Sequence, residues 1–197
     1  MAATRPAVDK RRMILDAAVR VFARRGFNGC RVSDIAEEAG VAYGLVYHYF
    51  RSKDEVLETI FRTTWTDMLG TVESIAETGE PARDQIRKVT EVILRAWRRD
   101  PDLVRVLVRE ITRSPHLQRE LDEVGAAFAA LQAIVERGQE QGEFRRDVDP
   151  RLASVVWYGA LEEILTGWAL ERLPDDDESV ARAERTVVSA FCDGLVA

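Results

Sequence analysis

Ring-bearing side chains gather in the segment AGVAYGLVYHYFRSKDEVL, residues 39–57, where Tyr43, Tyr47, His48, Tyr49 and Phe50 lie close together. If this segment is helical, Phe50 turns inward, whereas Tyr43 and Tyr47 are four residues apart and share an outward face. An outward tyrosine offers a hydroxyl that can donate to phosphate and a ring that can contact a thymine methyl, and His48 adds a second polar tip. The segment is therefore a candidate for contact with a nucleic-acid duplex. The alternative, that the rings simply fill a core, stays open, more for Tyr49 than for Tyr43.

Enzymatic chemistry finds little support in the sequence. His48 and His116 are the only histidines, so neither a paired-histidine metal site nor a histidine-based catalytic triad can be assembled. No glycine-rich phosphate loop follows a strand. Glu162 and Glu163 could in principle act as acid and base, but neighbouring residues point about 100 degrees apart on a helix, and we interpret them as charges on a partly exposed face. We therefore expect no catalytic residues, no metal and no cofactor.

Composition and charge are those of an ordinary globular protein. The chain has 197 residues, 46% hydrophobic and 31% charged, with a formal net charge of -6. Residues 1–60 carry ten Lys or Arg against eight Asp or Glu, whereas the remainder carries 18 against 26, so the basic part is N-terminal. Charges interrupt every apolar run short of the about 18 residues that a membrane span needs, and we expect a cytoplasmic protein with no membrane partner. Cys30 and Cys192 lie far apart in no metal-ligand spacing, which favours ordinary thiols over a disulfide.

Hydrophobic periodicity predicts helices almost everywhere. Apolar residues recur every three or four positions in a first helix of about Asp9 to Arg25, which ends at Gly26. A second pattern, at about 32–39, is two turns long and stops at Gly40, a residue that readily takes the left-handed conformation of helix ends. The stretch LVYHYF then follows VAYG as a third short helix. Two short helices joined by a tight glycine-containing turn and braced by a longer helix are the arrangement of a helix-turn-helix.

A denser set of matches lies in GFNGCRVSDIAEEAGVAYGLVYHYFRSKDEVL. With its Asp-Ile-Ala, its Ala-Gly-Val, a following glycine, Tyr-x-x-Phe and a lysine before a long helix, the segment resembles the DNA-binding segment of the TetR family of bacterial transcriptional regulators. The match covers about Lys10 to Phe61. The resemblance implies an all-α fold of about nine helices. It also implies a three-helix DNA-binding domain with a helix-turn-helix at 1–52 and a larger helical ligand-binding and dimerisation domain at 53–197.

The resemblance further implies which side chains meet DNA. Lys53 matches the family's phosphate-contacting lysine, and Gly44 would let the backbone approach a phosphate, although helix packing alone could also require a glycine there. Cys30 and Arg31 stand where the family commonly has two threonines, and Ala42 where it often has serine, so a hydroxyl cap and a phosphate contact are missing. Arg31 could reach the phosphate itself or be a solvated side chain near a poorly capped helix end. The predicted DNA-contacting residues are Arg31, Ser33, Tyr43, Gly44, Leu45, Tyr47, His48 and Lys53.

Beyond residue 61 the pattern predicts more helices, separated by proline, glycine or acidic breaks. They span about 53–68 and beyond, 82–98, 102–111, 117–141, 151–173 and 179–196. All four tryptophans fall here among methionine and aliphatic residues, which suits a plain helical core as well as an apolar pocket between helices. By resemblance we favour a pocket for a small apolar effector, oriented by polar groups such as Arg109, Glu110, Tyr158 or Thr166. Its predicted lining is Trp65, Met68, Trp97, Val104, Leu107, Val108, Phe128, Leu131, Trp157 and Leu161.

A helix-turn-helix protein is expected to act as a two-fold dimer, which places two recognition helices about 34 Å apart. The segment RLASVVWYGALEEILTGWALERL is apolar on two faces, so it is either buried deeply or shared between its own core and a partner. We favour the shared role, with ERTVVSAFCDGLV beside it. The predicted interface residues are Val156, Gly159, Ala160, Glu163, Gly167, Val187 and Phe191.

Together with these patterns, the resemblance implies a homodimeric repressor that binds a palindromic double-stranded DNA operator and is released by a small apolar ligand. Two alternatives stay open. One is a constitutive DNA-binding module whose second domain only dimerises, and the other is an all-helical enzyme or carrier.

Overall fold

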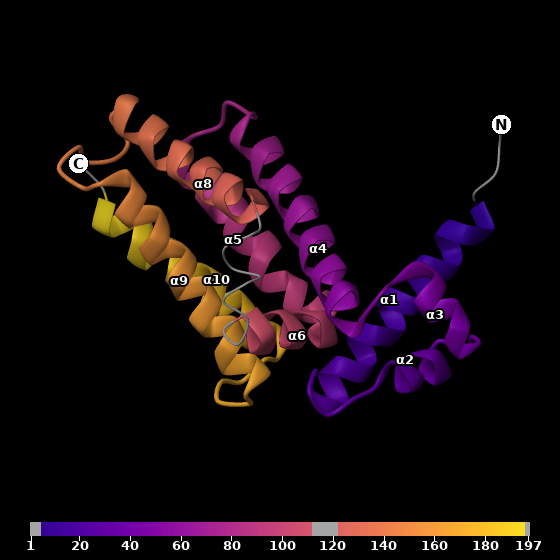
Figure 1. The fold of residues 1–197 in the computed structure, drawn as a ribbon. Coiled ribbons are helices and arrows are strands. Elements are labelled where there is room, and N and C mark those ends of the chain that lie inside the picture. Colours follow the sequence, from indigo (N-terminus) through magenta and orange to yellow (C-terminus); the bar gives the residue numbers. More distant parts are fainter. Residues whose placement is uncertain (1–4, 112–121, 196–197) are drawn as a thin grey trace.

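The computed structural model describes residues 5–111 and 122–195 and folds them into helices joined by short loops (Figure 1). The predicted all-α fold class is confirmed, and the helices begin and end close to the predicted positions. In the described ranges the helices are α1 (Arg5–Arg25), α2 (Val32–Glu38), α3 (Tyr43–Tyr49), α4 (Lys53–Ala76), α5 (Ala82–Arg99), α6 (Pro101–Ile111), α8 (Asp122–Glu140), α9 (Pro150–Ala169) and α10 (Asp177–Leu195). The predicted start of a helix at residue 117 lies outside the described residues.

The three N-terminal helices share one small core. Ile14 and Phe22 of α1 are buried against Ile35 of α2, Val46 of α3 and Phe50, the residue that caps α3. These apolar positions are the ones that the three- and four-residue spacing turns to one side of each helix. Truncation of a buried phenylalanine to alanine typically costs about 3–5 kcal/mol, so this core determines where α2 and α3 lie.

The longer helices α4 to α10 form the rest of the molecule. In Figure 1, α8, α9 and α10 lie at the end away from α2 and α3, while α4 runs from the N-terminal helices toward α8. The first half of α4, including Phe61, is buried in the N-terminal core, whereas Val72 near its other end belongs to the second core. Helix α6 also contacts both α1 and α9, so α4 and α6 both connect the N-terminal helices to the rest of the molecule.

The helix predicted at 151–173 ends earlier, at Ala169. Leu170 caps α9, and Glu171 takes the left-handed conformation with φ 57°. The chain then turns back, so that the Arg172 N–H donates to Gly167 O at 2.8 Å. Leu173 packs directly over Gly167, where a Cβ would lie 2.6 Å from the leucine Cδ1. Leu173, whose apolar side chain made the predicted helix longer, thus packs over the end of α9 and is not part of it.

None of the helices in the described ranges is both long and apolar enough to cross a membrane. Cys30 and Cys192 are buried free thiols, and burial is the main cause that raises the pKa of both, that of Cys192 to about 11.

Candidate nucleic-acid interface and internal cavity

The start of α2 lacks the hydroxyl cap that helix N-termini favour. Its N-cap residue is Arg31, whose guanidinium has no acceptor atom, and no side-chain cap is formed. Instead the Asp34 carboxylate accepts the Arg31 backbone N–H at 2.7 Å and pairs with Arg25 of α1 at 2.9 Å. The hydrogen bond from this backbone N–H is the largest of the effects that lower the pKa of Asp34. The Arg31 side chain is thereby left exposed at the entrance to α2, near exposed Ser33.

A glycine in the left-handed conformation closes the turn between α2 and α3. Gly40 has φ 63°, its N–H donates to Glu37 O at 3.1 Å, and the Val41 N–H donates to Ala36 O at 3.0 Å. This is the Schellman pattern of helix C-termini, and a side chain at Gly40 would be strained at that φ. The tight turn therefore determines the direction in which the chain enters α3.

Helix α3 has an inward and an outward face. Val46 and the capping residue Phe50 are buried, while Tyr43 and Tyr47 are 53% and 44% exposed. The two exposed rings lie 5.0 Å apart, and the Tyr43 hydroxyl donates to the Tyr47 hydroxyl at 3.2 Å. This hydrogen bond is the main cause that raises the pKa of Tyr43. Because Tyr47 accepts in this pair, its own proton is left for an acceptor outside the chain.

No contact inside the chain requires a glycine at position 44. Gly44 lies exposed in the first turn of α3, and a Cβ added there would meet no atom within 4 Å. The alternative that helix packing demands this glycine is therefore excluded for the described chain. Gly44 and Tyr47 are three residues apart on the helix, so the open space lies on the side of the exposed tyrosines.

The side chain of Lys53 turns toward the protein. Its ammonium donates to the carbonyl oxygens of Phe27 and Cys30, the latter at 2.8 Å, and lies 4.3 Å from the centroid of the Phe27 ring. It thus ties the first turn of α4 to the loop between α1 and α2. The predicted role of Lys53 as an outward phosphate contact is not supported by this conformation, in which two of its three donors serve carbonyl groups.

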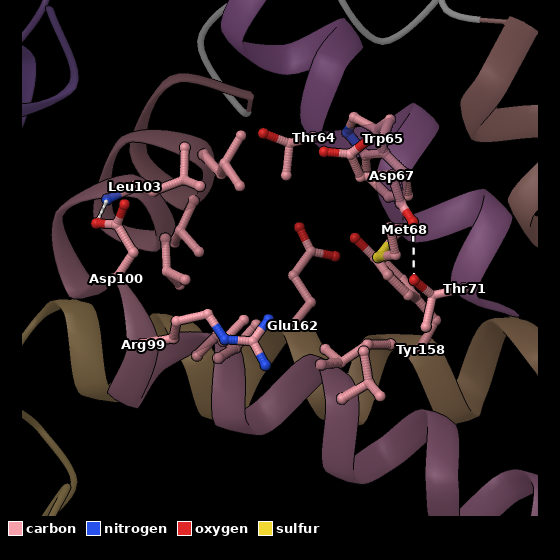
Figure 2. A pocket seen from close by; sticks show the side chains of 17 residues that line it. Thr64, Trp65, Asp67, Met68, Thr71, Arg99, Asp100, Leu103, Tyr158 and Glu162 are labelled. Carbon is pink, nitrogen blue, oxygen red and sulfur yellow. Dashed lines mark hydrogen bonds between the residues drawn. The ribbon is translucent and has the colours of Figure 1, made fainter. Parts of the chain in front are cut away.

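A cavity of about 260 Å³ that is open to the surface lies between α4, α5, α6 and α9 (Figure 2). Most of its wall is apolar, with polar side chains at a few points. The lining residues are Thr64, Trp65, Asp67, Met68, Thr71, Val92, Ile93, Ala96, Arg99, Asp100, Leu103, Val104, Leu107, Val108, Tyr158, Glu162 and Leu165. A largely apolar cavity with a few convergent polar groups is the usual form of a small-molecule site.

A carboxylate projects into this cavity. Figure 2 shows Glu162 of α9 pointing into the space between the side chains of α4 and those of α5 and α6. Burial is the main cause that raises the pKa of Glu162, and the neighbouring Glu163 adds to it. Tyr158, one turn earlier on α9, has its pKa raised mainly by burial and then by Glu162. The α9 wall of the cavity therefore disfavours negative charge unless a cation or donor is brought to it.

Another face of α9 is exposed and apolar. Leu152, Val155 and Val156 are all exposed, Val156 by 67%, and the small residues Gly159 and Ala160 continue the exposed stretch. Contiguous apolar patches on a surface commonly mark contact with another protein. Small residues in such a patch let a second helix approach closely.

Two family models match this chain. The one described as "Bacterial regulatory proteins, tetR family" matches residues 14–60, and the one described as "Tetracyclin repressor-like, C-terminal domain" matches residues 83–160. The chain belongs to the TetR family. It is therefore a DNA-binding transcriptional regulator and not an enzyme.

Individual relatives of this TetR-family chain match it over nearly its whole length. The fatty acid metabolism regulator protein of Bacillus subtilis is 29% identical over 184 residues, which are 92% of this chain and 93% of that protein. The HTH-type transcriptional repressor KstR2 of Rhodococcus jostii is 28% identical over 191 residues, 94% of this chain and 91% of that protein. The crystal structure of the transcriptional regulator FadR from Bacillus subtilis in complex with stearoyl-CoA superposes with a TM-score of 0.82 at 26% identity, covering 93% of this chain and 98% of that one.

Half of the residues predicted to line a pocket do line the cavity. They are Trp65, Met68, Val104, Leu107 and Val108, together with Tyr158 among the predicted polar groups. Their contact with a ligand stays a prediction. The other predicted residues do not line this cavity: Trp97, Phe128, Leu131, Trp157 and Leu161, and the polar residues Arg109, Glu110 and Thr166.

The predicted lining residues that lie outside the cavity pack in the core or between helices. The indole N–H groups of Trp97 and Trp157 donate to Asp175 at 3.0 Å and to Thr90 at 3.1 Å, which holds both rings between helices. Leu131 and Leu161 are buried in the same core, and the Phe128 ring packs edge-on against the ring of Tyr158.

Arg109 and Glu110 face the N-terminal helices instead of the cavity. Arg109 donates to Ala23 O at 3.5 Å and to Ala169 O at 3.4 Å, and Glu110 accepts from the Phe27 N–H at 3.4 Å. The end of α6 is therefore joined to the end of α1.

Sequence reasoning missed the polar part of the cavity wall. Glu162 was expected on a partly exposed face, and Thr64, Asp67 and Arg99 had no predicted role. The signal available was the position of Glu162 one turn after Tyr158, which places both on one side of α9.

Two of the predicted dimer residues are buried in their own chain. Gly167 is covered by Leu173, and Val187 is only 6% exposed, so in this conformation neither offers its side to a partner. Phe191 is half-buried, its ring stacked on Trp157 with centroids 5.7 Å apart. The remaining predicted residues, Val156, Gly159, Ala160 and Glu163, are exposed on α9.

The predicted DNA-contacting residues other than Lys53 lie at the α2–α3 end of the molecule (Figure 1). Leu45 is half-buried, and the rest are exposed: Arg31, Ser33, Tyr43, Gly44, Tyr47 and His48. A side chain must be exposed to contact DNA. The contacts of these residues with DNA stay predictions.

Proposed function

We propose that this TetR-family regulator is a repressor that binds a palindromic operator as a homodimer and is released when a small, largely apolar ligand enters the cavity. The observation that carries this proposal is the course of α4. Its first residue, Lys53, holds the loop between α1 and α2, and its middle residues Trp65 and Met68 line the cavity. A ligand that alters the position of α4 thereby alters the position of the DNA-binding helices.

On the DNA side, we propose that α3 enters the major groove. Tyr47 would donate its free hydroxyl proton to a phosphate, and Tyr43 would contact a base edge or a thymine methyl. Gly44 would allow the helix to approach the DNA backbone, with His48, Leu45, Arg31 and Ser33 around it. The proposed DNA-binding domain is residues 1–52, and 53–197 is the proposed ligand-binding and dimerisation domain.

For the dimer, we propose that the exposed face of α9 meets the same face of a second copy. A two-fold interface is self-complementary, so Val156, Gly159 and Ala160 would pack on their own counterparts with Leu152 and Val155 beside them. The dimer would place two α3 helices about one helical turn of DNA apart, about 34 Å.

For release, a ligand must bind more tightly to the conformation that does not fit DNA, because it shifts the equilibrium only by this difference in affinity. Elongated apolar compounds are the first candidates. The Bacillus subtilis neighbour was crystallised with stearoyl-CoA, which supports testing fatty acyl thioesters together with hydrophobic drugs.

The experiment that tests this proposal begins with selection of bound DNA from a random pool by the purified full-length chain. We expect a short palindrome, bound by two protomers, with affinity that falls steeply as salt rises because phosphate neutralisation releases counterions. A library of apolar compounds is then screened for loss of operator binding. Recovery of a palindrome without any compound that changes its affinity would favour a constitutive regulator, and recovery of no site would contradict the DNA-binding role of α3.

A further inference from the structure

The cavity holds an acidic group with no partner in the described part of the chain. Glu162 projects into the space in Figure 2, and no hydrogen bond or ion pair joins its carboxylate to any described residue. Two further acids, Asp67 and Asp100, stand on the wall against the single base Arg99. Asp100 is occupied as a helix cap, since it accepts the Leu103 N–H at 2.9 Å. The charge of the cavity is therefore negative overall.

Aromatic rings from two helices line the same cavity as Glu162. Trp65 of α4 and Tyr158 of α9 both line the cavity, with ring centroids 6.0 Å apart and planes at 40°. Aromatic faces attract cations through the ring quadrupole, most strongly where water is excluded. A carboxylate and aromatic rings that line one cavity are the chemistry that binds an ammonium group. Burial also raises the pKa of Glu162, which is the sign of a carboxylate that lacks a counter-ion.

We infer that the ligand of this cavity carries a positively charged nitrogen, a protonated or quaternary amine, which sits against Glu162 and beside the rings of Trp65 and Tyr158. The apolar body of the ligand lies along the α6 side chains Val104, Leu107 and Val108. This inference rests on the proposed function, in which the cavity is the effector site, and it narrows the ligand to apolar cations. A fatty acyl chain offers no positive charge to Glu162, so long-chain acyl thioesters are disfavoured as ligands of this chain.

The test compares three compounds with one tail and different head groups on the full-length protein. Decyltrimethylammonium, decanol and decyl sulfate are titrated below their micellar concentrations, with tryptophan fluorescence and calorimetry as readouts. The cation is expected to bind at least about tenfold more tightly than decanol, and the sulfate more weakly than either, because the rings and the carboxylate favour positive charge. Operator affinity is measured in parallel with each compound.

Two variants test whether the Glu162 carboxylate is the charge that distinguishes the head groups of the three compounds. Glu162→Gln is expected to weaken the cation by about tenfold and to leave decanol unchanged. Glu73→Gln, which neutralises an exposed glutamate on α4 that does not line the cavity, is expected to preserve the selectivity. Thermal melting checks that both variants fold, and the head-group comparison on the unaltered chain needs no variant.

The outcomes separate this inference from the proposed function. If decanol or decyl sulfate binds as tightly as the cation and releases operator, the inference is overturned and the proposed function stands. Equal loss of selectivity in both glutamine variants also overturns the inference. If none of the compounds binds, the inference is overturned, and the screen of apolar compounds for loss of operator binding then tests the proposed function separately.

Discussion

Gly44 lies in the first turn of α3, and among the described residues no atom outside its own stretch of helix comes within 4 Å of the position where a Cβ would stand. Gly40, four residues earlier, differs because its φ of 63° is required by the turn. A glycine that no contact or backbone conformation within the protein requires lowers the stability of its helix, since glycine is about 1 kcal/mol less favourable than alanine within a helix. At the scale of residues, the proposed reason for Gly44 is a close approach of DNA.

Gly44→Ala is therefore expected to bind operator at least about tenfold more weakly, while the free energy of unfolding stays equal or rises by up to about 1 kcal/mol. Urea unfolding and fluorescence anisotropy on the selected operator measure the two quantities. Gly70→Ala is the matched control, because Gly70 is also helical, exposed and without atoms near a Cβ. Equal operator affinity in the two variants would contradict the proposed approach of DNA at Gly44.

Lys53→Ala is expected to lower the free energy of unfolding by about 1–3 kcal/mol without any DNA present, since two carbonyl groups lose a charged donor. The effect on DNA affinity should follow from the loosened loop between α1 and α2. A lysine that only touched phosphate would leave stability unchanged and weaken DNA binding alone. Arg51→Ala removes a neighbouring exposed cation and serves as the control in both assays.

Residue roles in the larger domain were only partly predictable. Trp65 and Trp157 are both buried tryptophans on helices, yet one lines the cavity and the other donates to Thr90 in the core. Periodicity tells which side of a helix is apolar, but a core and an apolar cavity wall give the same pattern. Glu162 is partly exposed, as the sequence predicts, but its place in the cavity wall was not predicted because the helices that form the rest of that wall are distant in sequence.

At the scale of elements, the end of α9 shows how a small residue fixes the course of the chain. The chain reverses after Ala169, and Leu173 returns to pack on Gly167. Trp168 donates its indole N–H to Pro174 O at 3.0 Å, which holds the returning segment.

Gly167→Ala is expected to cost about 1–3 kcal/mol of unfolding free energy, because the new methyl overlaps the Leu173 side chain. Urea denaturation measures the loss. A double-mutant cycle with Leu173→Ala supplies the control, since the shorter side chain removes the overlap and should make Gly167→Ala nearly neutral. Additive effects of the two substitutions would show that Leu173 is not the group that requires the glycine.

The helices themselves were well predicted because their apolar stripes and their glycine and proline breaks are local signals. The helix-turn-helix was the clearest, since Gly40, Val46 and Phe50 each meet the conformation or burial that the pattern demands. The last turn of the 151–173 pattern was wrong because Leu173 is apolar for a contact made after the helix ends.

At the scale of the whole molecule, the proposed assembly depends on the exposed face of α9. Val156→Glu is expected to produce monomers at micromolar concentration and to weaken operator binding at least about tenfold, because two buried like charges would face each other across the two-fold axis. Analytical ultracentrifugation and anisotropy provide the readouts. Ser74→Glu, an exposed change on α4 away from that face, is the control. Intact dimers in Val156→Glu would place the interface elsewhere.

For the whole molecule, the proposed function requires that a ligand in the cavity changes the affinity for DNA. One titration tests this requirement. Anisotropy of labelled operator is followed with increasing protein, first alone and then with a saturating compound that is known from tryptophan fluorescence to bind the chain. We predict two protomers per operator and a loss of affinity of about 5–150-fold with the compound, the usual range of coupling between sites. An operator affinity that stays the same at saturation would contradict the account.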